Sequence, residues 1–287
     1  MDGEELVHYV HGLNWARECS LHRSGLGWEP RLVRMLCSTT ANDGHFGPLL
    51  PFARACAGSG HEVRVAAPMS YGAALARVGL PHEPFADAPP EVIGPIMASL
   101  PAMAVEEADE VVVREVFGRI DAQAALPSLL ETVERWRPHV VVRESAELAS
   151  LAAAERAGVP HVHVCIGMHE VASRFAEAIR DPLEELGGLA GLEAGQMAAA
   201  LAGEPVFSLV PQLLDHTSGE VPQGADAFKR FHEPAQATTG HRLLSGATPT
   251  SRWSTSPSAR SPARYLPSPG SSARRSTPSP VSMRASS

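Results

Sequence analysis

The chain has 287 residues, a formal net charge of −8 and only 5% aromatic residues. This length fits one α/β domain, or at most two small ones, with a core of small aliphatic side chains. So acidic a chain repels nucleic acid and anionic membrane surfaces, and we expect to find neither among its partners. The first residues lack the basic and apolar segments of a signal peptide, and no apolar run is long enough for a membrane span.

The cysteines are scattered through the chain without a CxxC pair, at Cys19, Cys37, Cys56 and Cys165. This spacing favours neither a disulfide framework nor a zinc site. We therefore expect free thiols in a reducing compartment, which makes the cytoplasm the expected location.

The first 30 residues show no sustained periodicity and are expected to be an irregular extension. A start codon assigned too early is the alternative, since Val33 or Met35 would open the domain more naturally. The pattern that follows predicts a strand over 33–37, a polar loop over 38–47, a helix over 48–57 and a strand over 62–66. Pro48 suits the first position of that helix, because its missing N–H has no intrahelical partner there.

A second strand–helix–strand unit is predicted farther along, with strands at 139–143 and 161–165 around a helix at 145–157. Segments 91–136 and 171–201 are helical and apolar in pattern. The alternation predicts an α/β domain over 31–235, a Rossmann-like and mostly parallel sheet with helices on both faces. In such sheets ligands bind at the carboxyl ends of the strands, where the segments after Cys37 and Val142 fall.

Residues 236–287 are expected to form a linker and a disordered tail, because from about Gly240 the sequence is Ser, Pro, Arg, Ala and Thr without Asp or Glu. A shifted reading frame accounts for this composition. Codons for residues 247–257 (ATPTSRWSTSP), read one nucleotide earlier, can encode GDADEPLVYVS, and continuing through Leu266 permits FGSVAGTLP. That string resembles the first strand of a second α/β domain. A functional disordered tail is the alternative.

The segment TTANDGHFGPLLPFARACAGSGHEVRVAAP carries a Gly-His-x-x-Pro motif formed by Gly44, His45 and Pro48. Together with RPHVVVRESAELASLAAAERAGVPHVHV, it resembles the amino-terminal domain of nucleotide-sugar-dependent glycosyltransferases that modify natural products, the macrolide and flavonoid enzymes. The resemblance covers residues 33 to about 235. It implies the GT-B fold, in which the first domain binds a small hydrophobic acceptor and a second binds a UDP- or TDP-sugar. Motifs of that second domain are absent from the sequence.

Sugar transfer to a hydroxyl needs a base, and a histidine near its neutral pKa suits that role. We expect His45 to be this base, in the loop before a helix whose positive end would keep the imidazole neutral. The resemblance implies an acidic partner after the later strand, at Glu144. Glu147 and Asp43 are the alternatives for that partner. The structural alternative for His45 is a loop histidine without a catalytic role. For Glu144 it is a solvated acidic residue at the start of a helix.

Other residues are expected to contact the acceptor rather than take part in the chemistry. Met97 and Met103 could line an adaptable pocket, or could be ordinary core residues, and Phe46 lies in the motif itself. A metal site is one interpretation of three nearby histidines, His161, His163 and His169. Packed or hydrogen-bonded histidines fit this spacing better. We therefore expect no metal and no bound cofactor.

Three functions remain open on the sequence. The first is an inverting glycosyltransferase of the hexosyltransferase type, of which this chain would be an inactive fragment. The second is a non-catalytic acceptor-binding module or helper that associates with a homologue carrying a donor domain. The third is a dinucleotide-dependent oxidoreductase, which the loop STTANDGHFG disfavours because it lacks GxGxxG spacing.

Overall fold

The computed structural model describes residues 32–211, 214–215 and 228–231. The predicted extension over 1–30 and the tail over 236–287 lie outside these residues, as do parts of the segment that precedes the tail. In the described part of the chain, no helix has both the length and the apolar character needed to span a bilayer.

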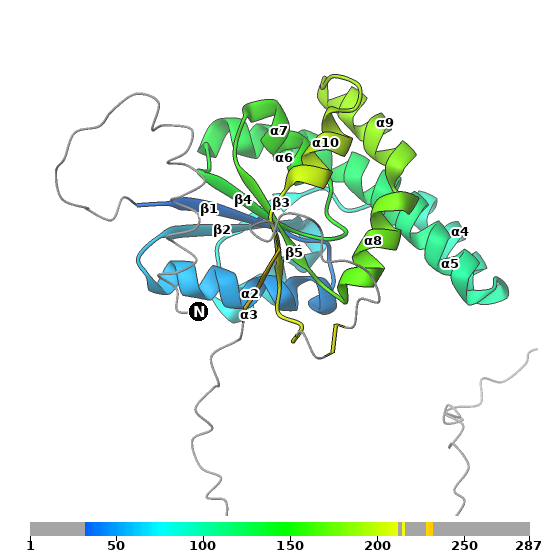
Figure 1. Ribbon diagram of the computed structural model, residues 1–287, viewed down its shortest axis with the longest axis horizontal. Helices are drawn as coiled ribbons and strands as arrows, with labels where there is room; N and C mark the ends of the chain where they lie inside the picture. Colours follow the sequence, from blue (N-terminus) through cyan, green and yellow to red (C-terminus); the bar gives the residue numbers. More distant parts are fainter. Residues whose placement is uncertain (1–31, 212–213, 216–227, 232–287) are drawn as a thin grey trace, which may run out of the picture. The chain divides into compact units, whose positions relative to one another are not determined.

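A seven-stranded sheet forms the centre of the described fold (Figure 1). Its order is β3-β2-β1-β4-β5-β6-β7, and each neighbouring pair is parallel. The strands are β1 (Arg34–Ser38), β2 (Glu62–Pro68), β3 (His82–Phe85), β4 (Val140–Glu144), β5 (His161–Cys165), β6 (Val206–Ser208) and β7 (Phe228–Arg230). The predicted Rossmann-like sheet is therefore confirmed.

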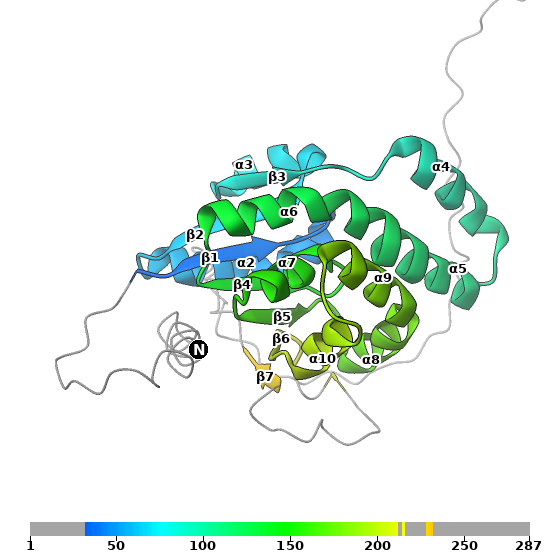
Figure 2. The ribbon, with the colours of Figure 1, turned by 90° about the horizontal axis from the view of Figure 1, so that it is seen from above.

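Helices cover both faces of the sheet because successive strand residues point to opposite sides. In β1, Met35 and Cys37 pack in one core cluster, while Leu36 packs in the other. The first cluster includes side chains of α2 (Asp43–Gly58) and α3 (Gly72–Val78), which follows the short helix η1 (Met69–Tyr71). The second includes side chains of α6 (Ala122–Trp136), α7 (Ala149–Ala157), α9 (Arg180–Ala190) and α10 (Gln196–Gly203), which lie together across the sheet in Figure 2. Helix α8 (His169–Ala178) precedes α9.

Between β3 and α6 the chain forms α4 (Pro90–Ser99), η2 (Leu100–Ala102), α5 (Val105–Val111) and the π-helical segment η3 (Val112–Asp121). Helices α4 and α5 contribute no buried residue. Segment η3 runs into α6 with helical dihedral angles at the junction. π-Helical turns inside longer helices often occur at functional sites, because they change which side chains face inward.

Helix α2 begins at Asp43, not at Pro48 as predicted. Asn42 caps it with an extended backbone, and its side chain accepts a hydrogen bond of 2.7 Å from the Gly44 N–H. This cap offsets the weakness of two prolines, Pro48 and Pro51, inside the helix. His45 consequently lies in the first turn of α2 and not in a loop.

The order of strands reverses direction between β1 and β4, which are neighbours although β2 and β3 come between them in the chain. Such a switch point opens a crevice at the carboxyl ends of the two strands, where parallel α/β proteins bind their ligands. The segment after β1 carries His45, and β4 ends at Glu144. Topology alone thus brings these two side chains to the same place.

Candidate active site

His45 and Glu144 meet at the switch point. Nδ1 of His45 lies 3.2 Å from Oε2 of Glu144, with the imidazole side chain 15% exposed and the carboxylate fully buried. The distance is that of an ion pair, but Nδ1 has no partner among the described residues with the angles of a good hydrogen bond. Such contacts commonly align only when substrate binds.

Glu144 is held in place by hydrogen bonds from the backbone. Its Oε1 accepts from the N–H of Thr40 at 3.1 Å and from the Thr40 hydroxyl at 3.2 Å, while Oε2 accepts from the N–H of Ala146 at 2.6 Å. Burial raises the pKa of Glu144, but His45 and these N–H groups outweigh it and lower the pKa below its usual value. Glu144 is therefore an ionised, hydrogen-bonded carboxylate beside the imidazole.

The pKa of His45 is raised, contrary to the expectation that the helix end keeps the ring neutral. Burial lowers this pKa, but the carboxylates of Glu144 and Asp121 oppose burial and prevail. Two nearby negative charges favour the imidazolium more than the positive end of α2 disfavours it. The ring is a stronger base than a free histidine, and its Nδ1 faces a carboxylate.

Segment η3 brings two further side chains to the site that the sequence analysis missed. The ring of Phe117 lies 5.3 Å from the ring of His45, between centroids. Asp121 acts on both His45 and Glu144 through its charge, and its own pKa rises to about 6, mainly because it is buried and also because Glu144 repels it. Helical spacing offered a signal, because Asp121, Ala125 and Leu129 fall on one face and the latter two are buried.

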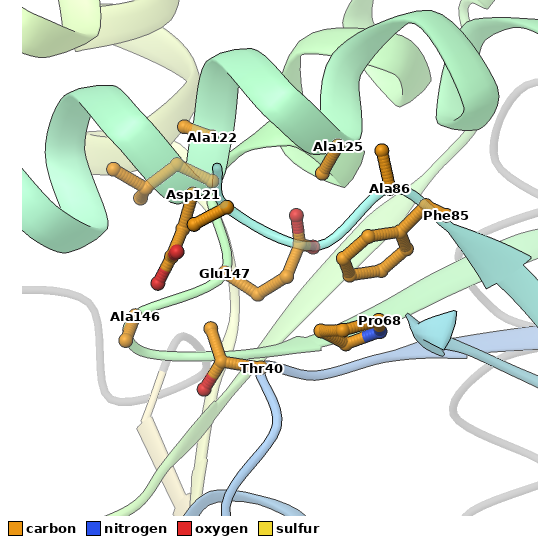
Figure 3. A pocket seen from close by; sticks show the side chains of 11 residues that line it. Thr40, Pro68, Phe85, Ala86, Asp121, Ala122, Ala125, Ala146 and Glu147 are labelled. Atoms are coloured by element: carbon orange, nitrogen blue, oxygen red, sulfur yellow. The ribbon is translucent and has the colours of Figure 1, made fainter. Parts of the chain in front are cut away.

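Asp121 and Glu147 line a small cavity between α6 and the carboxyl ends of the strands (Figure 3). Its volume is about 20 Å³, which is enough for one water molecule. Figure 3 shows both carboxylates at the cavity, with Thr40 and Ala146 below them. These last two residues hold Glu144, so the cavity lies next to the His45–Glu144 contact.

The two alternative partners for His45 are bound elsewhere. Asp43 accepts a hydrogen bond of 2.6 Å from the hydroxyl of Tyr71. Glu147 accepts hydrogen bonds from the N–H groups of Ala149 at 2.9 Å and Ser150 at 3.1 Å, and so caps α7. This helix begins at Ala149 and not at Ser145 as predicted. Of the three candidates, Glu144 is the one within ion-pair distance of His45.

The residues expected to contact an acceptor fall in different environments. Phe46 is 4% exposed and packs in the core against Tyr71, so the structure does not support a contact with an acceptor. Its inward direction follows from the earlier start of α2. Met97 is 47% exposed in α4, and Met103 is half-buried after η2. Neither methionine is a core residue, and neither lines the cavity beside Asp121.

His161 and His163 are engaged by protein groups. His161 lies between Glu155 and Glu204, at 3.0 and 3.1 Å, and Nε2 of His163 lies 2.8 Å from the Ser145 hydroxyl. Among the described residues, no group of three or more His, Cys, Asp or Glu side chains could hold a metal ion. The side chain of His169 is outside the description.

Comparison with known proteins places the chain in a family. Residues 54–199 match the family model described as erythromycin biosynthesis protein CIII-like, N-terminal domain. The 4'-demethylrebeccamycin synthase of Lentzea aerocolonigenes is 29% identical over 148 residues, which are 50% of this chain and 34% of that protein. The L-demethylnoviosyl transferase of Streptomyces niveus is 31% identical over 141 residues, 47% of this chain and 35% of that protein.

Solved structures show the same fold. The spinosyn rhamnosyltransferase SpnG matches with a TM-score of 0.52 and 20% identity over 66% of this chain and 48% of that one. Structures of SpnG with spinosyn aglycone and with thymidine diphosphate match with a TM-score of 0.51 each. The chain spans about a third of the length of these curated relatives and about half of SpnG. The chain belongs to the family described as erythromycin biosynthesis protein CIII-like, N-terminal domain, and it shares its fold with the spinosyn rhamnosyltransferase SpnG.

Proposed function

We propose that this domain binds a small hydrophobic acceptor and that His45 is the base that removes the proton from its hydroxyl group. The observation that carries the proposal is the contact of 3.2 Å between Nδ1 of His45 and the buried carboxylate of Glu144. A proton on Nδ1 facing a carboxylate leaves Nε2 with the lone pair, as a base requires. Glu144 orients the ring and stabilises the imidazolium, without itself taking the proton.

The reaction is an inverting displacement. Nε2 of His45 takes the hydroxyl proton as the acceptor oxygen forms a bond to the anomeric carbon of the sugar. The bond from that carbon to the nucleoside diphosphate breaks, and the diphosphate leaves with the electron pair. Because the transfer is concerted, a base whose pKa is raised by neighbouring carboxylates is well matched to a hydroxyl that becomes acidic only in the transition state.

The donor is proposed to be a UDP- or TDP-sugar. Support comes from SpnG, which has been solved with thymidine diphosphate and has the same fold in this region. The donor half would come from the alternative reading frame after residue 246 or from a homologue with its own donor domain. Met97 and Met103 are kept as proposed acceptor contacts because both are accessible. In the part of the chain that the structure describes, three buried cysteines form no disulfide, which supports a cytoplasmic location.

The test is sugar transfer by protein in which the alternative frame has been restored near Leu244. We expect His45→Gln to lower turnover by roughly 10²- to 10⁴-fold, the usual contribution of a general base. His61→Gln is the matched control, because His61 bonds the backbone of Val33 at the opposite end of the strands. Equal turnover in His45→Gln and the control would refute the assignment.

A further inference from the structure

Arg143 is an arginine inside the sheet. It lies in β4 and is fully buried. Its Nη1 donates to three carbonyl oxygens of the segment that follows the strand, at 3.1 Å for Glu144, 3.5 Å for Ser145 and 3.3 Å for Glu147. These residues begin the connection between β4 and α7. One guanidinium therefore holds the backbone segment that carries the buried carboxylates of Glu144 and Glu147.

Glu204 is the charged partner of the Arg143 guanidinium. Its carboxylate is fully buried, forms an ion pair with Nη2 of Arg143 and accepts from Nε at 3.1 Å. Burial raises the pKa of Glu204, but the charge of Arg143 and the contact with His161 outweigh it and lower the pKa to about 2. The pair is thus ionised at neutral pH, and the planar guanidinium is held by two oxygens.

Two histidines of β5 extend the network. His161 joins Glu204 to Glu155, as described above, while His163 contacts the hydroxyl of Ser145. The same hydroxyl accepts a hydrogen bond of 3.3 Å from the N–H of Ile166. The connection after β4 is consequently tied at its backbone by Arg143 and at a side chain by β5.

A gain in folding stability does not by itself explain why the protein has the buried Arg143–Glu204 ion pair. Replacing a buried ion pair by apolar side chains of similar volume is often neutral or stabilising, because desolvation of two charges offsets their attraction. What apolar side chains cannot supply is a set of donors that fixes three carbonyl groups at once. The geometry of the connection, and not the stability of the sheet, is what Arg143 uniquely provides.

We propose that Arg143, held by Glu204, is a positioning residue that keeps the β4–α7 connection in the conformation in which Glu144 faces His45. The inference rests on the proposed function only in assigning Glu144 as the partner of His45. Arg143 itself touches neither the acceptor nor the reacting atoms. Its effect reaches His45 through Glu144, whose second oxygen is held by the N–H of Ala146 in the same connection.

The experiment is an NMR titration of the His45 imidazole in the full 287-residue chain, assigned by comparison with His45→Asn. The test variant is the double substitution Arg143→Met/Glu204→Leu, which removes the ion pair without leaving a buried charge alone. Glu144→Gln gives the reference change. The matched control is Arg64→Met, since Arg64 is a strand arginine with two carboxylate partners away from the site.

We expect the pKa of His45 to fall in the double variant, by a large part of the fall in Glu144→Gln, and to be unchanged in Arg64→Met. The double variant removes one positive and one negative charge together and leaves the net charge unchanged, so a fall identifies a loosened Glu144. A folded double variant with an unchanged His45 pKa would overturn the inference. If Glu144→Gln also leaves the pKa unchanged, the proposed function fails instead.

Ser145→Ala serves as the second variant should the double substitution not fold. It removes the hydroxyl that bonds His163 and Ile166 and leaves every charge in place. The expected result is a smaller fall in the His45 pKa with little loss of thermal stability. If Ser145→Ala lowers thermal stability but leaves the His45 pKa unchanged, the result counts against the positioning role of the β4–α7 connection.

Discussion

Glu144 and Glu147 are buried in the same connection, yet their pKa values shift in opposite directions. Burial raises the pKa of both carboxyl groups, but His45 and backbone N–H groups reverse the shift at Glu144. At the carboxyl group of Glu147, hydrogen bonds from Ser150 do not outweigh burial, and the charge of Glu144 raises the pKa further. The two acids therefore differ in function. Glu144 is the partner of His45, and Glu147 is the cap of α7.

Glu147→Ala is expected to lower the free energy of unfolding by about 1 kcal/mol, the usual effect of losing a helix cap. Urea denaturation measures it, with Glu147→Gln as the control that keeps an acceptor oxygen. The titration of His45 should stay close to that of the wild type. A loss of sugar transfer in Glu147→Gln as large as in His45→Gln would instead make Glu147 part of the chemistry.

Asp121→Asn is expected to stabilise the protein at pH 8 by about 1–2 kcal/mol, since one pKa unit corresponds to about 1.4 kcal/mol and partial exposure reduces the effect. The folded-state pKa of about 6 lies above the usual 3.8, so ionised Asp121 costs stability. That cost appears as the pH rises from about 4 to about 6 and is complete above it. Denaturation at pH 4 and pH 8 checks the sign.

The same substitution should lower the pKa of His45, because the charge of Asp121 contributes to raising it. Asp43→Asn is a suitable control, since Asp43 is engaged by Tyr71. A His45 pKa that is unchanged in Asp121→Asn, as in Asp43→Asn, would show that Asp121 does not act on the imidazole.

Much of the fold follows from sequence pattern, because buried parallel strands are uniform apolar runs. The strands around Leu36, Val142 and Val164 were predicted within about two residues, and their parallel order follows from the helices between them. The start of α2 was misplaced because Pro48 is a strong helix-start signal, whereas the structure uses the side chain of Asn42 as the cap.

The site could be predicted only in part. The family resemblance singles out His45 through the Gly-His-x-x-Pro motif and Glu144 as the acidic residue after the later strand. Asp121 was missed because helical spacing shows only that it shares a face with the buried Ala125 and Leu129, whereas its place beside His45 and Glu144 depends on tertiary packing. The expected neutrality of His45 failed for the same reason, since Asp121 and Glu144 reach the imidazole from distant parts of the sequence.

The 287-residue chain alone is expected to form no glycoside and to bind nucleotide sugars weakly. Inverting displacement needs fixed donors at the leaving diphosphate, and such electrostatic stabilisation is usually the largest catalytic contribution. Purified chain, incubated with a panel of nucleotide sugars and hydroxylated aglycones, tests activity, and calorimetry tests donor binding. Measurable product or micromolar donor affinity would show that this domain does more than bind the acceptor.

The central claim is that Glu144 holds His45 as a base of raised pKa, and the NMR titration of the His45 imidazole in wild-type chain and in Glu144→Gln tests it most directly. The wild-type pKa should lie above the usual value of 6.5, and Glu144→Gln should lower it because the carboxylate that stabilises the imidazolium is gone. A wild-type pKa at or below 6.5, unchanged in a folded Glu144→Gln variant, would contradict the account.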